Sequence, residues 1–186
     1  MWFLFSGFIA ILSALMLDVP KASGKAKHQL EHDTPDAFKT FEAFPHAVEA
    51  FDVDGDGDLD CLFTVRQYLD EDRKIATYSW QLAPVNGRPA KNHTYHWREG
   101  STPDKPVFTV DDGADGEQTA QVIYTNYKNC AVAIIPYKNR ESCGLWVDKD
   151  TLHSIPQECM DQFEDNCDMT IPVFDDETCK DVLNGI

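Results

Sequence analysis

The chain has 186 residues, which fits one domain, and its formal net charge is -16, from 32 acidic against 16 basic residues. An acidic surface of this kind repels phosphate backbones, so the composition excludes nucleic acid as a partner. It would attract cations, although acidity also simply keeps secreted proteins soluble. All six cysteines follow residue 24, and their even number fits an oxidised disulfide framework whose pairing the spacing alone leaves open.

An apolar run over residues 2–17 opens the chain, and the small residues Ala22, Ser23 and Gly24 follow it. The run is too short for a membrane span, so it predicts a secretory signal peptide over 1–24, although it lacks the usual Lys or Arg at its start. An uncleaved anchor is the alternative. The expected product is a secreted, monomeric domain over 25–186 without membrane attachment.

A short helix is predicted next. Residues 33–36, Asp-Thr-Pro-Asp, offer a capping residue followed by proline at the first helical position. Phe38, Phe41 and Phe44 then recur every three residues as an apolar stripe, and Pro45 ends it. In a barrel such a helix would plug one mouth.

From residue 46 the pattern changes to short strands divided by turn residues, as in all-β folds. Eight antiparallel strands suit an up-and-down β-barrel wide enough for one small ligand, and a sandwich of two sheets is the rival architecture. A second helix is predicted after Pro156, with Cys159 and Phe163 on the face that packs against the barrel wall. The predicted strands run over 46–53, 59–69, 74–83, 91–99, 106–111, 118–127, 130–136 and 143–148.

The segment from residue 52 to residue 60 reads Asp-Val-Asp-Gly-Asp-Gly-Asp-Leu-Asp and matches the first nine positions of a calcium loop. Its candidate ligands would be Asp52, Asp54, Asp56 and Asp60. An EF-hand needs a bidentate Glu at position 12, where this chain has Phe63, and the alternation that follows indicates a strand instead of a helix. We therefore interpret the segment as an acidic hairpin turn, with calcium binding as the alternative.

Other chemical motifs are absent from the sequence. The histidines and cysteines give no set of three or four convergent zinc ligands, and neither a nucleophile elbow nor a glycine-rich phosphate loop occurs. The sequence therefore predicts neither an enzyme nor a cofactor. Asn92-His93-Thr94 is a glycosylation sequon, and we expect Asn92 to carry a glycan in a secreted chain.

Several short motifs, each weak alone, follow one another in a specific order. They are Asp36 to Phe38, Phe51 to Asp54, Asp60 to Leu62, Ala76 to Trp80, Tyr127 to Cys130, Cys143 to Val147 and Ile155 to Phe163. Together they resemble the salivary lipocalins of ticks, the group that includes the histamine-binding proteins, over nearly the whole chain after the signal. The resemblance implies a lipocalin barrel with the disulfides Cys61–Cys179, Cys130–Cys159 and Cys143–Cys167.

The resemblance also implies where a ligand would lie. Amine-binding members carry Asp directly after the cysteine that matches Cys130, and Glu directly before the Leu-Trp that matches residues 145–146. The physical reason is that a buried ammonium needs carboxylate partners. Here the two positions are Ala131 and Gly144, so both acids are missing.

Side-chain alternation along the strands extends this set. Gln121 stands where the amine binders have another acid, and Asp52 matches an acid at the cavity mouth. The predicted cavity is therefore apolar and short of carboxylates. Its candidate lining residues are Asp52, Phe108, Val110, Gln121, Ile123, Ala131, Gly144 and Trp146, with Thr125, Ala133 and Ile135 on the same strand faces.

Two functions are compatible with these observations. The first is a salivary scavenger that sequesters a small host mediator of inflammation. By family the ligand would be a histamine-like biogenic amine, whereas the missing acids favour a more apolar lipid mediator or an amine held by other acids. The second is a module that binds a host complement or clotting protein through its outer surface, which a barrel filled by its own side chains would favour.

Overall fold

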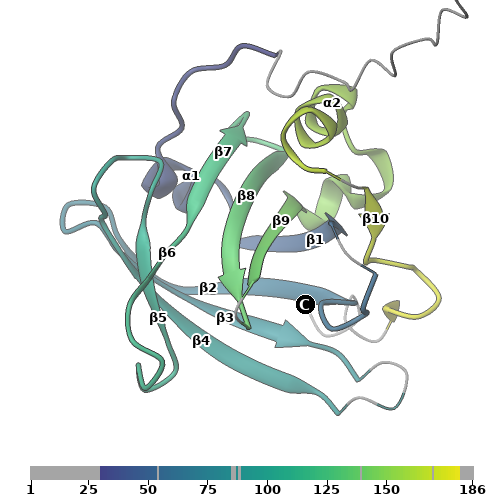
Figure 1. Cartoon of the computed structure of the whole chain (residues 1–186), viewed down its shortest axis with the longest axis horizontal. Helices are drawn as coiled ribbons and strands as arrows, with labels where there is room; N and C mark the ends of the chain where they lie inside the picture. The colour runs from purple at the N-terminus through teal and green to yellow at the C-terminus, as the bar shows by residue number, and fades with distance from the viewer. Residues whose placement is uncertain are drawn as a thin grey trace, which may run out of the picture.

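The computed structural model describes residues 30–53, 55–84, 87, 89–138, 140–168 and 170–180, so the predicted signal peptide lies outside the described residues. One antiparallel sheet makes up most of the molecule (Figure 1). Its strands are β1 (His46–Asp52), β2 (Leu62–Asp70), β3 (Ile75–Leu82), β4 (Lys91–Arg98), β5 (Val107–Val110), β6 (Gln118–Thr119), β7 (Gln121–Thr125), β8 (Cys130–Tyr137), β9 (Arg140–Val147) and β10 (Ile171–Pro172). The helices are α1 (Ala37–Ala43), the 3₁₀ helix η1 (Lys149–Ser154) and α2 (Gln157–Asn166).

The strand order is β6-β5-β4-β3-β2-β1-β9-β8-β7, with β10 added beside β1. The two ends of this order, β6 and β7, are consecutive in the chain and meet at Ala120. The Ala120 amide donates to the Pro106 carbonyl at 3.0 Å, and the Val122 amide donates to the Asp104 carbonyl at 2.8 Å. The sheet therefore curls into a nearly closed barrel, which confirms the predicted barrel over the sandwich. The predicted count of eight strands is wrong, because the stretch 118–127 forms both β6 and β7 and because β10 adds a further short strand.

Three predicted strand boundaries are wrong. The strand predicted over 118–127 is bent at Ala120, so that its first part pairs with β5 and its second part with β8. The second predicted strand starts at Leu62 instead of residue 59, because Cys61 has a left-handed φ of 57° and ends a turn there. The last predicted strand starts at Arg140, because β8 and β9 form a tighter hairpin than the turn residues 138–142 suggested.

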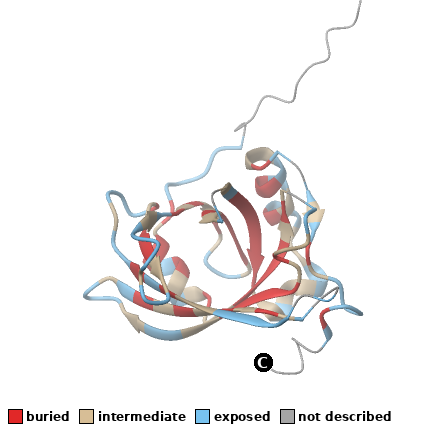
Figure 2. Ribbon diagram, turned by 60° about the horizontal axis from the view of Figure 1, so that its bottom comes forward, coloured by how far each residue is buried: buried red, intermediate tan, exposed pale blue. Residues whose placement is uncertain are grey.

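Alternation divides the apolar side chains into two clusters, one inside the barrel and one outside it. On β3 the buried positions alternate strictly, so that Ala76, Tyr78, Trp80 and Leu82 all point into the barrel. The outer cluster lies on β1, β8 and β9 where α2 covers them. Figure 2 shows buried residues both on the strands that surround the interior and on the face of α2 that meets the wall.

Helix α1 packs across one end of the barrel. Its N-cap is Asp36, whose carboxylate accepts hydrogen bonds from the Phe38 and Lys39 amides, so the predicted start with Pro35 as the first helical residue is wrong. The helix ends before Pro45, as predicted. Tyr78 from β3 donates to the Phe44 carbonyl at 2.8 Å, which ties the end of the helix to the barrel wall.

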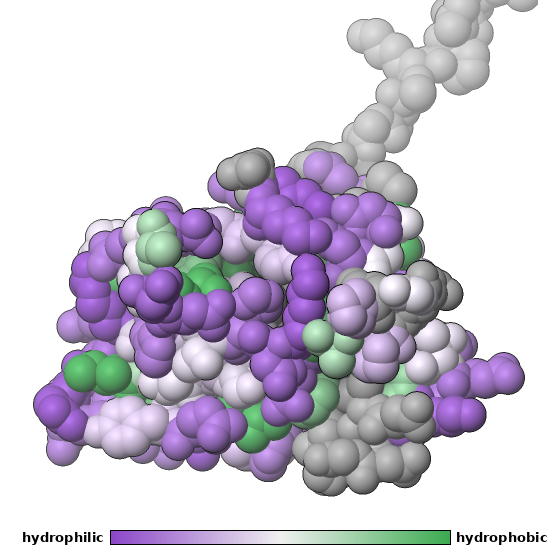
Figure 3. Space-filling view, turned by 90° about the horizontal axis from the view of Figure 1, so that it is seen from below, coloured by the Kyte–Doolittle hydropathy of each residue, from purple (hydrophilic) through white to green (hydrophobic). Residues whose placement is uncertain are grey.

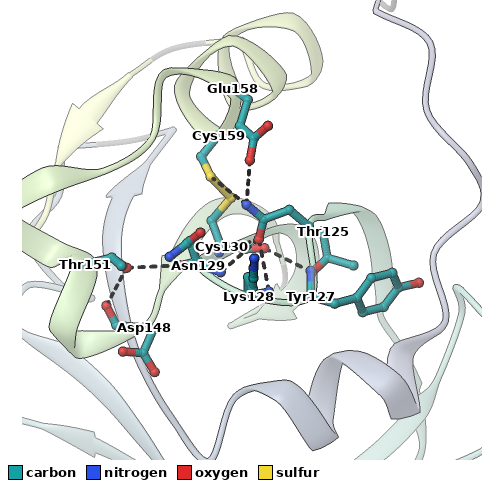
Figure 4. The surroundings of a disulfide bond; sticks show 10 residues. Thr125, Tyr127, Lys128, Asn129, Cys130, Asp148, Thr151, Glu158 and Cys159 are labelled. Carbon is teal, nitrogen blue, oxygen red and sulfur yellow. Dashed lines mark hydrogen bonds between the residues drawn. A yellow bond between two sulfur atoms is a disulfide. The ribbon is translucent and has the colours of Figure 1, made fainter.

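Three disulfides hold the C-terminal segment against the barrel, and they are the pairs that the family resemblance implied. Cys143–Cys167 and Cys130–Cys159 join β9 and β8 to α2, and Cys61–Cys179 ties the start of β2 to the tail. Near Cys130, the Asn126 side chain accepts hydrogen bonds from three backbone N–H groups of the turn and donates one to Glu158 of α2. Figure 4 shows Glu158 beside the Cys130–Cys159 disulfide. The disulfide therefore lies in a hydrogen-bonded junction between β8 and α2.

Candidate functional site

A cavity lies inside the barrel beneath α1, with a volume of about 80 Å³. Its lining contains no charged side chain and includes six aromatic residues. The lining residues are Thr40, Phe41, Phe44, Ala47, Thr64, Tyr78, Trp80, Trp97, Pro106, Ala120, Val122, Ala131, Ala133, Ile135 and Trp146. From below, hydrophobic atoms are visible in a hollow of a mainly hydrophilic face (Figure 3).

The aromatic rings around the cavity pack on one another. Trp80 contacts Trp146 with ring centroids 5.1 Å apart and stacks on Tyr95 at 4.1 Å. Trp97 contacts Phe41 of α1 at 5.2 Å. These contacts join the plug helix to the strands, so part of the cavity wall is a connected set of aromatic rings that can offer ring faces to a ligand.

Most polar atoms of the lining are engaged with the protein. Tyr78 donates to backbone carbonyls at the end of α1, and burial raises the pKa of its hydroxyl, which therefore stays neutral. Thr40 donates to the Asp36 carbonyl at 2.9 Å, and Thr64 lies 3.4 Å from the Ala47 carbonyl. The hydroxyl groups of the lining therefore add little polarity to the cavity.

On β8 and β9, part of the predicted set lies at the cavity. Ala131 and Ala133 of β8 line the cavity together with Ile135, and Trp146 lines it from β9. Phe108 points inward as predicted, but it is core instead of cavity wall, since it is buried against Trp97 at 4.7 Å. Val110, the other inward residue of β5, packs against the inner apolar cluster and does not line the cavity.

The prediction for β7 is wrong by one residue. Val122 lines the cavity, whereas Gln121 and Ile123 face a groove on the outside of the barrel. Gln121 Nε2 lies 3.3 Å from the Asp104 carboxylate there, so it has no access to the barrel interior. The strand is bent at Ala120 and carries a bulge at Ile123, and one displaced residue moves a strand's side chains to the opposite face.

Glu49 is the residue that sequence reasoning missed. It lies on β1 opposite Trp146, is only 1% exposed, and points into the barrel beside Gly144. A Cβ atom on Gly144 would overlap Glu49 Oε1 and lie 3.2 Å from Trp146 Nε1. An acid from β1 therefore occupies the space that a side chain at position 144 would need. Burial raises the pKa of the Tyr95 hydroxyl, and the neighbouring Tyr137, Asp111 and Glu49 raise it further, in that order.

Asp52 is buried at the end of β1 and does not line the cavity. Its Oδ1 accepts hydrogen bonds from Ser142 Oγ at 2.6 Å and from the Val53 amide at 2.7 Å. The carboxylate therefore caps the end of β1 and holds the start of the acidic loop. It does not lie at the mouth of the cavity, where it was predicted.

The acidic loop that follows is bound to the β8–β9 hairpin by ion pairs. Arg140 donates to Asp56 at 2.8 Å and to Asp58 at 2.7 Å, and Lys138 donates to Asp58 at 2.7 Å. Burial raises the pKa of Asp58, but the hydrogen bonds from Lys138 and Arg140 outweigh it and hold this pKa below its ordinary value. We call Asp56, Asp58, Lys138 and Arg140 the loop latch.

The described residues contain no group of three or more His, Cys, Asp or Glu side chains that could hold a metal ion. Three of the predicted calcium ligands lie in this part of the chain without forming such a group. Asp52 caps a strand end and Asp56 belongs to the loop latch. Asp60 lies in the turn before β2, where its carboxylate lies beside Gly57. Asp54 lies outside the described residues.

Among the described residues, no helix has the length and apolar character needed to cross a membrane. Asn92 is exposed on β4, as a glycan would require.

Comparisons with known proteins agree with this fold. Among solved structures, japanin from Rhipicephalus appendiculatus bound to cholesterol is 14% identical, with a TM-score of 0.53 over 73% of this chain and 95% of that one. A serotonin complex of AM182 is 16% identical, with a TM-score of 0.60 over 81% and 97% of the two chains. A biogenic amine-binding protein is 13% identical, with a TM-score of 0.53 over 83% and 95%.

At these identities the likeness concerns the fold alone. No curated protein sequence matches the chain. The model of the tick histamine binding protein family, however, matches residues 50–181, which is well over half of the chain and includes the six cysteines. The chain therefore belongs to the tick histamine-binding protein family.

Proposed function

We propose that this protein binds and sequesters a small, largely apolar molecule inside the barrel, and that it does so as a secreted protein. The observation that carries the proposal is the cavity, whose lining combines many aromatic rings with no charged side chain. Such a lining gains roughly 25 cal/mol for each Å² of apolar surface that a ligand removes from water. The lining offers no nucleophile or acid–base pair, so binding without conversion is the activity it supports.

An amine is a less favourable ligand for this lining. An ammonium group needs carboxylate partners when it is buried, and Ala131 supplies none. Glu49 is the observation that speaks for an amine, because its carboxylate stands in front of Gly144, near the place where amine-binding relatives carry an acid. It is not among the cavity-lining residues, however, and this favours the apolar ligand. Structures of the same fold have been solved with cholesterol and with serotonin, so precedents exist for both kinds of ligand.

The size of the cavity limits the ligand. A volume of about 80 Å³ is below the range of roughly 300–1,000 Å³ in which drug-sized ligands bind. A molecule as large as a lipid mediator would therefore need the aromatic side chains of the wall to move. The small volume is also the observation that favours the second candidate function, which is binding of a host protein through the outer surface.

The biological part of the proposal rests on the family and the disulfides. Three disulfides fit an oxidising, extracellular environment, and the predicted signal peptide would lead there. We propose that the protein acts in tick saliva, where removing a host mediator of inflammation from the bite site would suppress the host's defence.

Native mass spectrometry of the secreted full chain tests the proposal, followed by calorimetry with histamine, serotonin, a leukotriene and cholesterol. Ala133→Leu would fill the cavity, and Ala114→Leu adds the same atoms at an exposed turn as a matched control. We expect an apolar ligand that the wild type and Ala114→Leu retain and that Ala133→Leu releases. A wild-type protein that binds no molecule of the panel, and carries none from its host, would leave the surface function as the better account.

A further inference from the structure

Two indole groups of the cavity wall have buried donors without acceptors. Trp97 is 4% exposed and Trp146 is 8% exposed, and both line the cavity. Within the described part of the chain, neither Nε1 atom has a hydrogen-bond partner. Buried tryptophans usually have a partner for this group, and a buried donor without one lowers the stability of the fold. Two such donors around one cavity are therefore a sign of a missing acceptor.

The chemistry of these donors restricts what can satisfy them. An indole N–H only donates, so its partner must be an acceptor, such as a carbonyl, hydroxyl or ether oxygen. A protonated amine has only donors and is not complementary to this pair. An anion is disfavoured as well, because the lining contains no cation and the carboxylate of Glu49 lies close to Trp146.

We propose that Trp97 and Trp146 form a hydrogen-bonding subsite that selects an uncharged ligand with at least one acceptor oxygen on an apolar body. The inference rests on the proposed binding of a small apolar molecule in the barrel, and it adds the chemical class of that molecule. Trp97 lies on β4 and Trp146 on β9, separated around the sheet by β3, β2 and β1, so the two donors come from different walls. Each can therefore serve an acceptor at a different place on the ligand.

The test compares two probes of similar shape, acetophenone and ethylbenzene, which differ by a carbonyl group in place of a methylene group. With wild-type protein we expect acetophenone to bind about fivefold more tightly, as one net hydrogen bond allows. Trp97→Phe and Trp146→Phe each remove one donor and keep an aromatic ring, so the preference should fall toward one in at least one of them. Trp80→Phe is the matched control, because Trp80 lines the same cavity but its nitrogen is not among the buried donors without partners.

A second measurement does not depend on how the variants fold. In a ¹⁵N–¹H spectrum of the full chain, acetophenone should shift the Nε1–H signal of Trp97 or Trp146 downfield more than ethylbenzene does. Equal affinity for the two probes, or a preference that both variants keep, would overturn the proposal, since the donors would then be satisfied otherwise, for example by water. If neither probe binds and no other apolar molecule binds either, the proposed function itself fails. If ethylbenzene binds as tightly as acetophenone, only the proposed subsite is refuted and the proposed function stands.

Discussion

The close approach of Glu49 to Gly144 predicts a strong coupling between these two positions. A Cβ atom on Gly144 would overlap Glu49 Oε1 and lie 3.2 Å from both Glu49 Cδ and Trp146 Nε1. The backbone of Gly144 does not have a positive φ, so alanine itself is tolerated there and the cost comes from overpacking alone. We expect Gly144→Ala to lower the free energy of unfolding by about 1–3 kcal/mol. For a chain of this size that corresponds to a melting temperature lower by about 2–12 °C.

A double-mutant cycle in urea measures the coupling. Glu49→Ala removes the carboxylate that alanine 144 would meet, so Gly144→Ala should cost much less in that background, with a coupling energy of at least about 1 kcal/mol. Gly55→Ala is the control, because its Cβ would meet only Ile171 at an ordinary 3.6 Å. Free energies that add to within about 0.5 kcal/mol would refute the assigned position of Glu49.

Three further predictions concern the latch, the tail and the surface. Asp58→Asn should cost about 1 kcal/mol of unfolding free energy at pH 7; because the pKa of Asp58 lies below 3.8 in the folded chain, urea melts should show this difference shrinking as the pH falls below about 4. Replacing Cys61 and Cys179 together by alanine should cost about 2–5 kcal/mol in the same assay, and a loss below 1 kcal/mol would contradict a structural role for that disulfide. Secreted protein should be heavier than its bare chain by one glycan, a mass difference that Asn92→Gln abolishes; equal masses would show that the site is not used.

The residues of β8 show how much of the site the sequence could predict. Strict alternation from Ala131 to Ile135 places every second side chain inside, and the regular β8–β9 pairing brings Trp146 opposite Ala131. The disulfides were predictable for another reason: they came from the family resemblance, since cysteine spacing alone leaves many pairings open. Regular strands and a shared cysteine framework are therefore what a single sequence conveys well.

The failures have equally specific causes. Gln121 and Ile123 were predicted to point inward, but a bend and a bulge in the strand turn them outward. No glycine, proline or other residue pattern in this strand indicates the bend or the bulge. Glu49 was missed because its importance depends on β1 pairing with β9, two strands far apart in the chain. A weak signal existed, since Glu49 is an acid between Val48 and Ala50, on the same face as Ala47.

Gly144 on β9 lies beside Glu49 on β1, so the two missing acids, at positions 131 and 144, affect ligand binding differently. Ala131 leaves an apolar wall, and its effect on ligand choice is direct because it lines the cavity. Gly144 is different, because the acid absent from β9 is matched by an acid on β1 that fills the same space. The barrel interior therefore contains one carboxylate, that of Glu49, but this carboxylate does not line the cavity. A ligand in the cavity meets aromatic faces and indole donors first, and this is why we place an uncharged acceptor, instead of an ammonium group, at the centre of its recognition.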